Sequence, residues 1–351
     1  MRDDKRKENT VSTKITGGPL NILFVGDIHL GRQPSYLTPA TWRSHVTDML
    51  DAALTNALRL QVHHLIILGD VFDNNHPHPQ DHAEFTDWLF RAKESGMSVI
   101  IIPGNHDYGN AEYTALEPYT RMRNTVKIIK QATTITLNGV PVKFFPWTPP
   151  DAPNKIGDIK GKTPYLIIHH EEVKGAKMDN GWLADGFTPR AKDFLVGGHL
   201  HTYQLVGKLQ RVLYVGTALV SHWNHAVQGF TLLTAKLVNG KLIVDHEQVP
   251  YTPPFLLKEL SLKAFLKLRR QKDKIRTYYR VIAPTGKDLP DDKRIVSRKF
   301  VGGDKKKETS RTKTSSITNL PSPMSWLIGR LPKEQRKQAM KVLSSVITVE
   351  E

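Results

Sequence analysis

Short apolar runs alternate with amphipathic segments over the first hundred residues of the chain. The runs NILFVGD (21–27), LIILGD (65–70) and MSVIIIPGN (97–105) predict buried strands. Between them, apolar residues recur at helical spacing, first after Thr38-Pro39, an N-cap signal with proline at the first helical position, and then up to Gly96, a C-terminal cap signal. The apolar positions of these two predicted helices are Trp42, Val46, Met49, Leu50, Ala53, Leu54 and Ala57, then Phe85, Trp88, Leu89 and Ala92. This β-α-β-α-β order predicts an α/β fold with helices on the faces of a sheet.

Shorter strand-like segments follow the third predicted strand. They lie at 125–129, 133–137, 140–145, 165–170, 193–199 and 211–217. Asn138-Gly139 separates two of them, and Asn239-Gly240 indicates a further hairpin. The core is expected to end near Pro253-Pro254.

The chain is expected to consist of five segments. They are a flexible leader (1–18), the main α/β domain (19–254), a small basic unit (255–300), a linker (301–318) and a helical segment (319–351). The linker is predicted from its polar, lysine-rich composition. The helical segment is predicted from apolar pairs at 339/340, 342/343 and 346/347, which give a helix one apolar face.

Charge is distributed unevenly along the chain. Of the net charge of +16, the stretch from Lys258 to the end contributes 24 Lys and Arg against 10 Asp and Glu. A basic excess confined to one end of the chain indicates a surface for a polyanion, with nucleic acid first among the candidates. The alternative is a solvated basic tail, which is the favoured interpretation for residues 301–315.

Composition excludes several other classes of protein and site. Hydrophobic residues make up 39% and charged residues 24% of the chain, which is typical of a soluble globular protein, and no apolar run approaches the length of a membrane span. The first residues lack the apolar core of a signal peptide. There are no cysteines, so disulfides and thiolate metal sites are excluded, and any metal must be held by His, Asp, Glu or Asn.

Polar side chains follow five of the predicted strands. They occur in the stretches Asp27-Ile28-His29, Gly69-Asp70-Val71-Phe72-Asp73, Gly104-Asn105-His106-Asp107, His169-His170 and Gly197-Gly198-His199-Leu200-His201. In an open α/β sheet the carboxyl ends of the strands meet at one edge, so these side chains should converge. Carboxylates, an amide and imidazoles there suit two divalent cations, bridged by a shared carboxylate that is best assigned to Asp70. Taken alone, residues 105–107 read more simply as a polar turn whose Asn and Asp cap local backbone.

These motifs resemble a known family. DIH, GDVFD, GNHD, HH and GGHLH are similar to the five-motif signature of the calcineurin-like metallophosphoesterases. More narrowly, DIHLG (27–31), GHLHTYQ (198–204) and YVGT (214–217) resemble the nuclease subunit of SbcCD-type DNA repair complexes, above all its bacteriophage relatives, the recombination endonuclease subunits. The resemblance covers about residues 20–250. It implies an α/β fold built as a two-sheet sandwich flanked by helices, with 255–300 as a small C-terminal capping unit and helices at the end of the chain.

The resemblance also implies roles for individual residues. One metal would be held by Asp27, His29, Asp70 and His201, and the other by Asp70, Asn105, His170 and His199. The family usually uses manganese. His106 matches the family's catalytic histidine, and Asp107 is expected to orient its ring.

Three points about these residues are left open by the sequence. His169 and His170 are adjacent on a strand that alternates faces, so one of them should be a ligand, and His170 is favoured. Asp73 stands where the eukaryotic and archaeal branch tends to have histidine, and its role is undecided. The histidines of NNHPHPQDH, which are His76, His78 and His82, are interpreted as loop surface.

The leading functional hypothesis is a manganese-dependent DNA nuclease, acting as an exonuclease and also as an endonuclease in recombination and repair. The alternatives are a phosphatase or small phosphodiesterase of the same fold, and a catalytically dead scaffold. Further expectations are an SMC-like ATPase partner of the SbcC type, a homodimer, no membrane association and a location in the cytoplasm of a bacterial or phage-infected cell. The apolar face of 324–347 would bind the ATPase or, alternatively, pack on its own core.

Overall fold

The computed structural model describes residues 18–301, apart from gaps at 110–112, 149–155, 157–158, 220–222, 224–225, 227 and 285–286. The chain divides into two compact units, 1–301 and 302–351. The predicted leader therefore lies almost entirely outside the described residues, and the predicted linker and terminal helical segment do so as well. Within the described part, no helix is both long enough and apolar enough to cross a bilayer.

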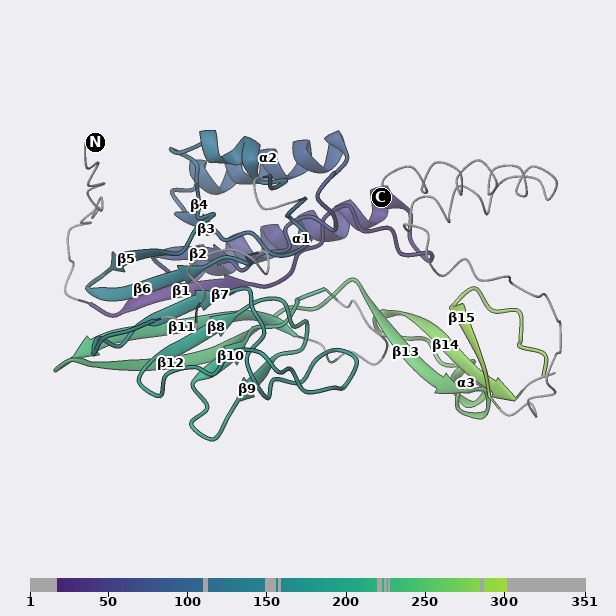
Figure 1. Ribbon diagram of the computed structural model, residues 1–351. Helices are drawn as coiled ribbons and strands as arrows, with labels where there is room; N and C mark the ends of the chain where they lie inside the picture. The colour runs from purple at the N-terminus through teal and green to yellow at the C-terminus, as the bar shows by residue number, and fades with distance from the viewer. Residues whose placement is uncertain are drawn as a thin grey trace, which may run out of the picture. The chain divides into compact units, whose positions relative to one another are not determined.

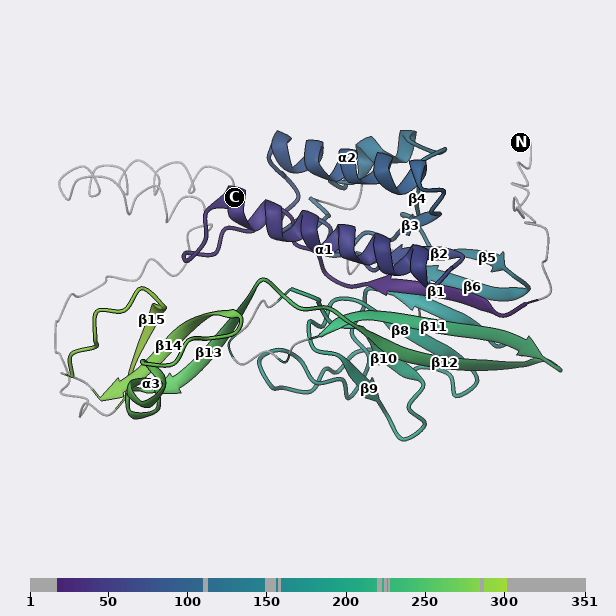
Figure 2. The same ribbon diagram turned by 180° about the vertical axis from the view of Figure 1, so that it is seen from behind.

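The first sheet is mixed and carries the two long helices on one face (Figures 1 and 2). Its strands, in spatial order, are β12 (Lys241–Pro250), β11 (Gly229–Val238), β1 (Leu20–Val25), β2 (His64–Ile67), β3 (Val99–Ile101) and β4 (Val126–Ile128). Strands β1 to β4 are parallel, and β11 runs antiparallel to β1 and to β12. Asn239 and Gly240 between β11 and β12 both have positive φ, 49° and 73°, as a tight two-residue hairpin requires, so the predicted hairpin is confirmed.

The second sheet lies against the other face of the first (Figure 1). Its strands, in spatial order, are β5 (Thr133–Leu137), β6 (Val140–Phe145), β7 (Leu166–His169), β8 (Phe194–Gly197), β10 (Val212–Tyr214) and β9 (Gln204–Val206). Side chains alternate along β1, so that Ile22 and Phe24 belong to the core between the sheets while Leu23 and Val25 belong to the core under the helices. The two-sheet α/β sandwich predicted for the chain is thereby confirmed.

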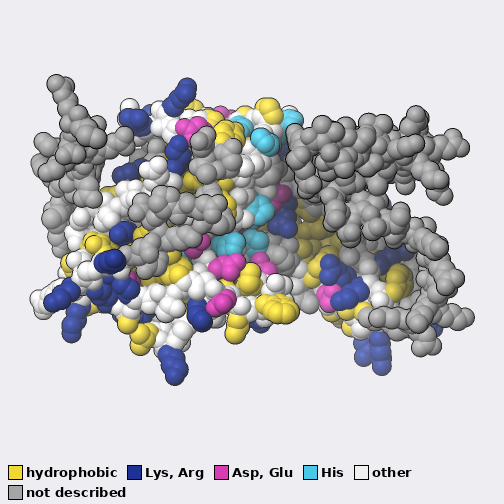
Figure 3. Space-filling model, in the orientation of Figure 1, with side chains coloured by type: hydrophobic (Ala, Val, Ile, Leu, Met, Phe, Trp, Pro, Cys, Tyr) yellow, Lys and Arg dark blue, Asp and Glu magenta, His cyan; other side chains and the backbone are white. Residues whose placement is uncertain are grey.

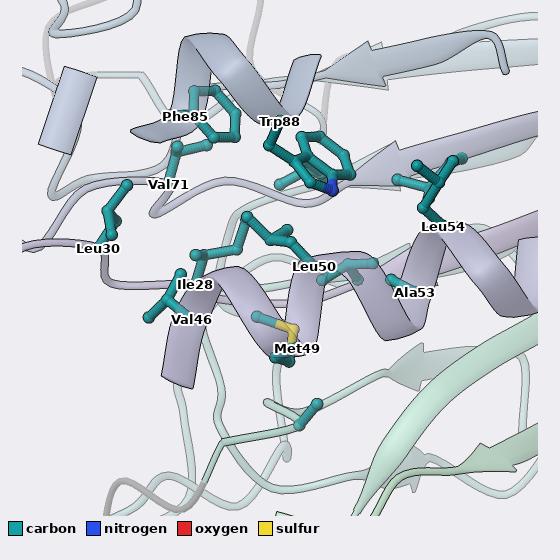
Figure 4. Packing of buried hydrophobic residues seen from close by; sticks show 14 of the residues in the cluster. Ile28, Leu30, Val46, Met49, Leu50, Ala53, Leu54, Val71, Phe85 and Trp88 are labelled. Carbon is teal, nitrogen blue, oxygen red and sulfur yellow. The ribbon is translucent and has the colours of Figure 1, made fainter. Parts of the chain in front are cut away.

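Helices α1 (Pro39–Arg59) and α2 (Pro79–Glu94) follow the predicted pattern closely. The side chain of Thr38 accepts a hydrogen bond from Thr41 N at 3.1 Å, which caps α1. The apolar faces of α1 and α2 meet over the sheet, where Trp88 lies among residues of α1 (Figure 4). At the start of α1 the buried indole of Trp42 donates a hydrogen bond to His29 O at 2.9 Å, so the helix also fixes the loop after β1.

Two short elements have no counterpart in the predicted pattern. They are β9 and the 3-10 helix η1 (Glu117–Arg121). Each is three to five residues long. β9 reads QLV and η1 reads EPYTR, so neither has the apolar run that marks the predicted strands.

Residues 255–301 form a separate sheet next to the sandwich. Strands β13 (Phe255–Ser261), β14 (Arg276–Pro284) and β15 (Ile295–Val301) are parallel, with helix α3 (Leu262–Leu268) between the first two. The sheet has a small core of its own around Phe265, Tyr279 and Val281. Phe255, Leu257 and Tyr278 instead belong to the main core under α1, and so attach this sheet to the sandwich.

Replacing Phe255 by alanine tests that attachment. Its buried ring lies 6.0 Å from the rings of Tyr36 and Tyr278 and 6.3 Å from that of Trp42. We expect Phe255→Ala to lower the free energy of unfolding by about 3 kcal/mol or more, measured by urea denaturation. Phe300→Ala is the matched control, since that ring is half exposed, and it should change stability by less than about 0.5 kcal/mol. Equal effects of the two changes would contradict the packing role of Phe255.

Candidate metal centre

The carboxyl ends of β1, β2, β3, β7 and β8 bring all seven predicted metal ligands into one cluster. These residues are Asp27, His29, Asp70, Asn105, His170, His199 and His201. Histidine and acidic side chains lie next to one another near the middle of the face shown in Figure 3. The geometry falls into two groups that share the region around Asp70.

The first group has two imidazoles that face each other. Nε2 of His29 lies 3.0 Å from Nε2 of His201, with Asp27 close to both. On the far side of each ring a carboxylate lies close to the other nitrogen: Asp73 Oδ1 is 3.2 Å from His29 Nδ1, and Asp179 Oδ2 is 2.9 Å from His201 Nδ1. If each Nδ1–H donates to its carboxylate, both Nε2 atoms present lone pairs toward the same point. That arrangement suits a cation.

The second group is built in the same way around Asn105. Its Oδ1 lies 3.1 Å from His170 Nε2 and 2.9 Å from His199 Nδ1. The remaining ring nitrogens are again held by the protein, since His170 Nδ1 is 2.6 Å from Leu68 O and His199 Nε2 is 3.4 Å from Glu172 Oε1. Imidazole nitrogens and an amide oxygen therefore converge on a second point.

Asp70 lies between the two groups. Its Oδ2 is 3.9 Å from Nε2 of His29 and 3.4 Å from Nε2 of His170, while Oδ1 accepts a hydrogen bond from His106 N at 2.9 Å. Burial alone would raise the pKa of Asp70, but the facing histidines lower it below its usual range. Against the effect of burial, Asp70 in turn raises the pKa of His170 to about 10. The cluster favours positive charge, which divalent cations would supply.

Asp27 contributes an oxygen that the described protein leaves unpaired. Its Oδ1 accepts a hydrogen bond from His199 N at 2.9 Å. Its Oδ2 is buried and has no hydrogen-bond partner among the residues that the structure describes. A buried carboxylate oxygen without a partner is costly unless a cation binds it. This oxygen fits the predicted metal centre.

The backbone at three of these positions is strained. His29, Asp70 and His199 have positive φ values of 51°, 47° and 77°, a region that residues other than glycine rarely occupy. Such strain is typical of functional sites, where surrounding structure enforces it. Gly104 allows the close approach, because a Cβ there would overlap Asp70.

The structure distinguishes the two adjacent histidines. His169 points into the core of the second sheet, where its ring meets Tyr214 and Phe187 edge to face at 5.6 and 5.9 Å. Burial lowers its pKa to about 3, so it is neutral. His170 points into the cluster, as alternation along the strand predicts. Two of the histidines interpreted as loop surface belong to α2 instead: His78 is its N-cap, and His82 lies within the helix, with Nδ1 2.9 Å from the Tyr119 hydroxyl.

His106 and Asp107 differ from expectation in one respect. The ring of His106 is held by Asp73 O, 2.8 Å from Nδ1, and not by Asp107. Both oxygens of Asp107 accept backbone N–H groups instead, from Phe72 at 3.0 Å, Gly104 at 2.9 Å and Val71 at 3.3 Å. Asp107 is fully buried and ties the loops after β2 and β3 together. The expected role of Asp107 as an orienting group for His106 is therefore corrected to one of fixing the backbone.

His106 itself remains exposed at the edge of the cluster. A ring nitrogen lies close enough to His29 and Asp70 for these three residues to form a further potential cation site. Its predicted catalytic role and a role as ligand are thus both compatible with its position.

The carboxylates behind the histidines are the part of the centre that sequence reasoning missed. Asp179 and Glu172 lie in the connection between β7 and β8, and Asp73 was noticed without a role. Asp179 lies far from any strand end, and nothing in the sequence distinguishes Glu172 or Asp73 from other acidic residues near strand ends. Only the fold places them next to His201, His199 and His29.

Removing Asp179 should weaken the first group without removing a ligand. Without its acceptor the ring of His201 is free to turn, so we expect Asp179→Ala to lower Mn²⁺ affinity by about 10- to 100-fold in a calorimetric titration of metal-free protein. Asp179→Asn keeps an acceptor oxygen and should lose less. Asp185→Ala is the matched control, because its carboxylate lies on the same connection but pairs with Lys174 at the surface, at 3.2 Å. Wild-type affinity in Asp179→Ala would contradict the positioning role.

Comparison with known proteins agrees with this geometry. The chain is 23% identical to the SbcD subunit of nuclease SbcCD from Escherichia coli strain K12 over 290 residues, which is 67% of this chain and 70% of that protein. It is 25% identical to the DNA double-strand break repair protein Mre11 of Sulfurisphaera tokodaii over 199 residues, 53% of this chain and 51% of that protein. The family model for calcineurin-like phosphoesterases matches residues 20–211, from the start of β1 to the strands that carry the last ligands. The chain belongs to the calcineurin-like phosphoesterase family.

Proposed function

We propose that the protein is a manganese-dependent nuclease that hydrolyses DNA phosphodiester bonds. The observation that carries the proposal is the convergence of seven oxygen and nitrogen donors in two groups around Asp70. Two relatives point in the same direction, since one is named as part of a nuclease and the other as a DNA double-strand break repair protein. The resemblance to bacteriophage recombination endonucleases remains a prediction.

Asp27, His29, Asp70 and His201 would hold one cation, and Asp70, Asn105, His170 and His199 the other. When bound, such a pair of cations lowers the pKa of a coordinated water and neutralises charge at phosphorus. Around it, the chain's own residues limit the geometry, because an oxygen of the protein lies behind each imidazole.

His106 is proposed to act on the scissile phosphate. Its Nδ1 donates to Asp73 O, so its Nε2 carries a proton only when the ring is an imidazolium. In that form it is an acid for the leaving oxygen and a stabiliser of the negative charge that develops on the phosphate.

The three-stranded unit is proposed to bind the DNA backbone. Residues 255–300 contain 14 Lys and Arg against 5 Asp and Glu. A groove of about 600 Å³ lies between this sheet and the loops after β1 and β2, and its lining includes Arg32, Asn74 and Arg280. Asp73 also lines it, so the groove begins next to the metal centre. Basic residues along such a groove favour a phosphate chain.

A phosphatase of the same fold and an inactive scaffold are the alternatives. The complete donor set argues against the scaffold, and the basic groove argues against a small substrate. The test is incubation of labelled linear duplex DNA with Mn²⁺, with and without chelator, in parallel with a small phosphomonoester. Cleavage of DNA that stops with chelator and is lost in Asp70→Ala supports the proposal, while hydrolysis of the phosphomonoester alone would replace it.

The nuclease is further proposed to work in the cytoplasm, as a homodimer and with an SMC-like ATPase. The proposed contacts are Met324, Trp326, Leu327, Leu331, Met340, Leu343 and Ile347, all outside the described residues.

Replacing His106 separates its two possible roles. If it is an acid or charge stabiliser, His106→Ala should keep Mn²⁺ content and DNA affinity near wild type while single-turnover cleavage falls by about 10²- to 10⁴-fold. His76→Ala is the matched control, since that histidine lies on the neighbouring loop. Loss of a cation from His106→Ala would make it a ligand, and an unchanged cleavage rate would make it a bystander.

Ending the chain after residue 318 tests the partner segment. The shortened protein should lose association with the ATPase in co-purification while its melting temperature stays within a few degrees of wild type. A large fall in melting temperature would show that the segment packs on its own domain.

A further inference from the structure

One exposed aromatic residue stands out on the connection between β7 and β8. The side chain of Trp182 is 76% exposed and that of Leu183 next to it 69%, the two highest values among the large hydrophobic residues that the structure describes. An indole is normally at least half buried in a folded protein. Neither residue contributes to the core clusters of the described chain.

The segment that carries Trp182 is an ordered hairpin. Ala184 N donates to Ala176 O and Gly175 N to Ala184 O, both at 2.8 Å. Closer to the tip, Met178 N donates to Trp182 O at 2.8 Å, and Trp182 N donates to the side chain of Asn180 at 2.9 Å. These bonds fix the backbone of Trp182, so its exposure is built into the hairpin.

The same hairpin is tied to the metal centre at two points. Asp179 Oδ2 lies 2.9 Å from His201 Nδ1. Gln204, three residues beyond that ligand, uses both ends of its amide on Lys177, accepting from its N–H and donating to its C=O at 2.8 Å each. Trp182 is three residues from Asp179, which limits their Cα separation to about 11 Å. Trp182 therefore lies on the same short hairpin as the carboxylate next to His201.

We infer that Trp182 binds the nucleic-acid substrate by stacking on an unpaired base near the scissile phosphate. The inference rests on the proposed function and names a residue for it. A single strand advances about 3.4 Å per stacked nucleotide, so a residue on the hairpin that carries Asp179 can meet a base a few nucleotides from the cut. Every base offers a π-face, which makes such a contact independent of sequence. One hairpin thus has two roles. It positions the DNA strand through Trp182 and the proposed metal ligand His201 through Asp179.

The experiment measures cleavage of a labelled single strand in which one nucleotide at a time lacks its base. For wild-type protein, removing the stacked base should lower kcat/KM by about 5- to 100-fold at one position, a few nucleotides from the cut. Trp182→Ala should cleave the intact strand as slowly as wild-type protein cleaves the strand that lacks this base. Removing the base should not slow Trp182→Ala any further. Trp182→Phe should keep most of the wild-type rate, because a phenyl ring still stacks.

Leu209→Ala is the control, since its side chain is 65% exposed on a different loop, and it should cleave as wild type does. Calorimetry should show wild-type Mn²⁺ affinity in Trp182→Ala, because the indole is no ligand. The inference is overturned if kcat/KM falls equally at every abasic position, or if Trp182→Ala cleaves as fast as wild type. In either case DNA cleavage by wild-type protein leaves the proposed function intact. If Trp182→Ala cleaved DNA normally but no longer bound the ATPase, Trp182 would belong to a protein contact, and the inference would be overturned as well. If wild type itself cleaves no DNA, the proposed function fails first.

Discussion

An imidazole that binds a metal has one nitrogen that carries a proton and one that offers a lone pair, and at this centre the surrounding protein favours one arrangement. Behind His29, His170, His199 and His201 stand Asp73, the carbonyl of Leu68, Glu172 and Asp179. Each of these oxygens lies next to one nitrogen, and the other nitrogen faces the cluster. Without these four contacts the same side chains could rotate away, and the two groups around Asp70 would lose their shape.

The loops that carry the ligands are fixed by a similar use of buried polar groups. Asp107 accepts three backbone N–H groups from two loops, and Trp42 donates from α1 to the carbonyl of His29. Burial and the nearby charge of Asp70 raise the pKa of Asp107 to about 7, whereas its three N–H donors favour the ionised form. A buried carboxylate is thus retained for its effect on backbone geometry, at some electrostatic cost.

The sequence predicted the main strands and helices and the side chains that face the metal centre. Buried strands and amphipathic helices have long periodic signals, and strand ends carry the ligands, so both were accessible from residue order. Alternation along the strand left only one of His169 and His170 as a ligand, and the choice of His170 came from the family resemblance. The contacts behind these side chains could not be predicted from the sequence. Asp179 reaches His201 from a loop that has no periodic pattern. Asp107 follows His106 in the sequence but accepts backbone N–H groups instead of contacting its ring.

The left-handed backbone of His29, Asp70 and His199 has a consequence for the folding equilibrium. Strained conformations of this kind cost about 1–3 kcal/mol each. Binding of the proposed cations would offset that strain, by an amount that grows with the free ion concentration. The temperature at which half of the protein is unfolded would then rise with the free concentration of the ion. The availability of the ion would thus help to set the folded fraction of the protein.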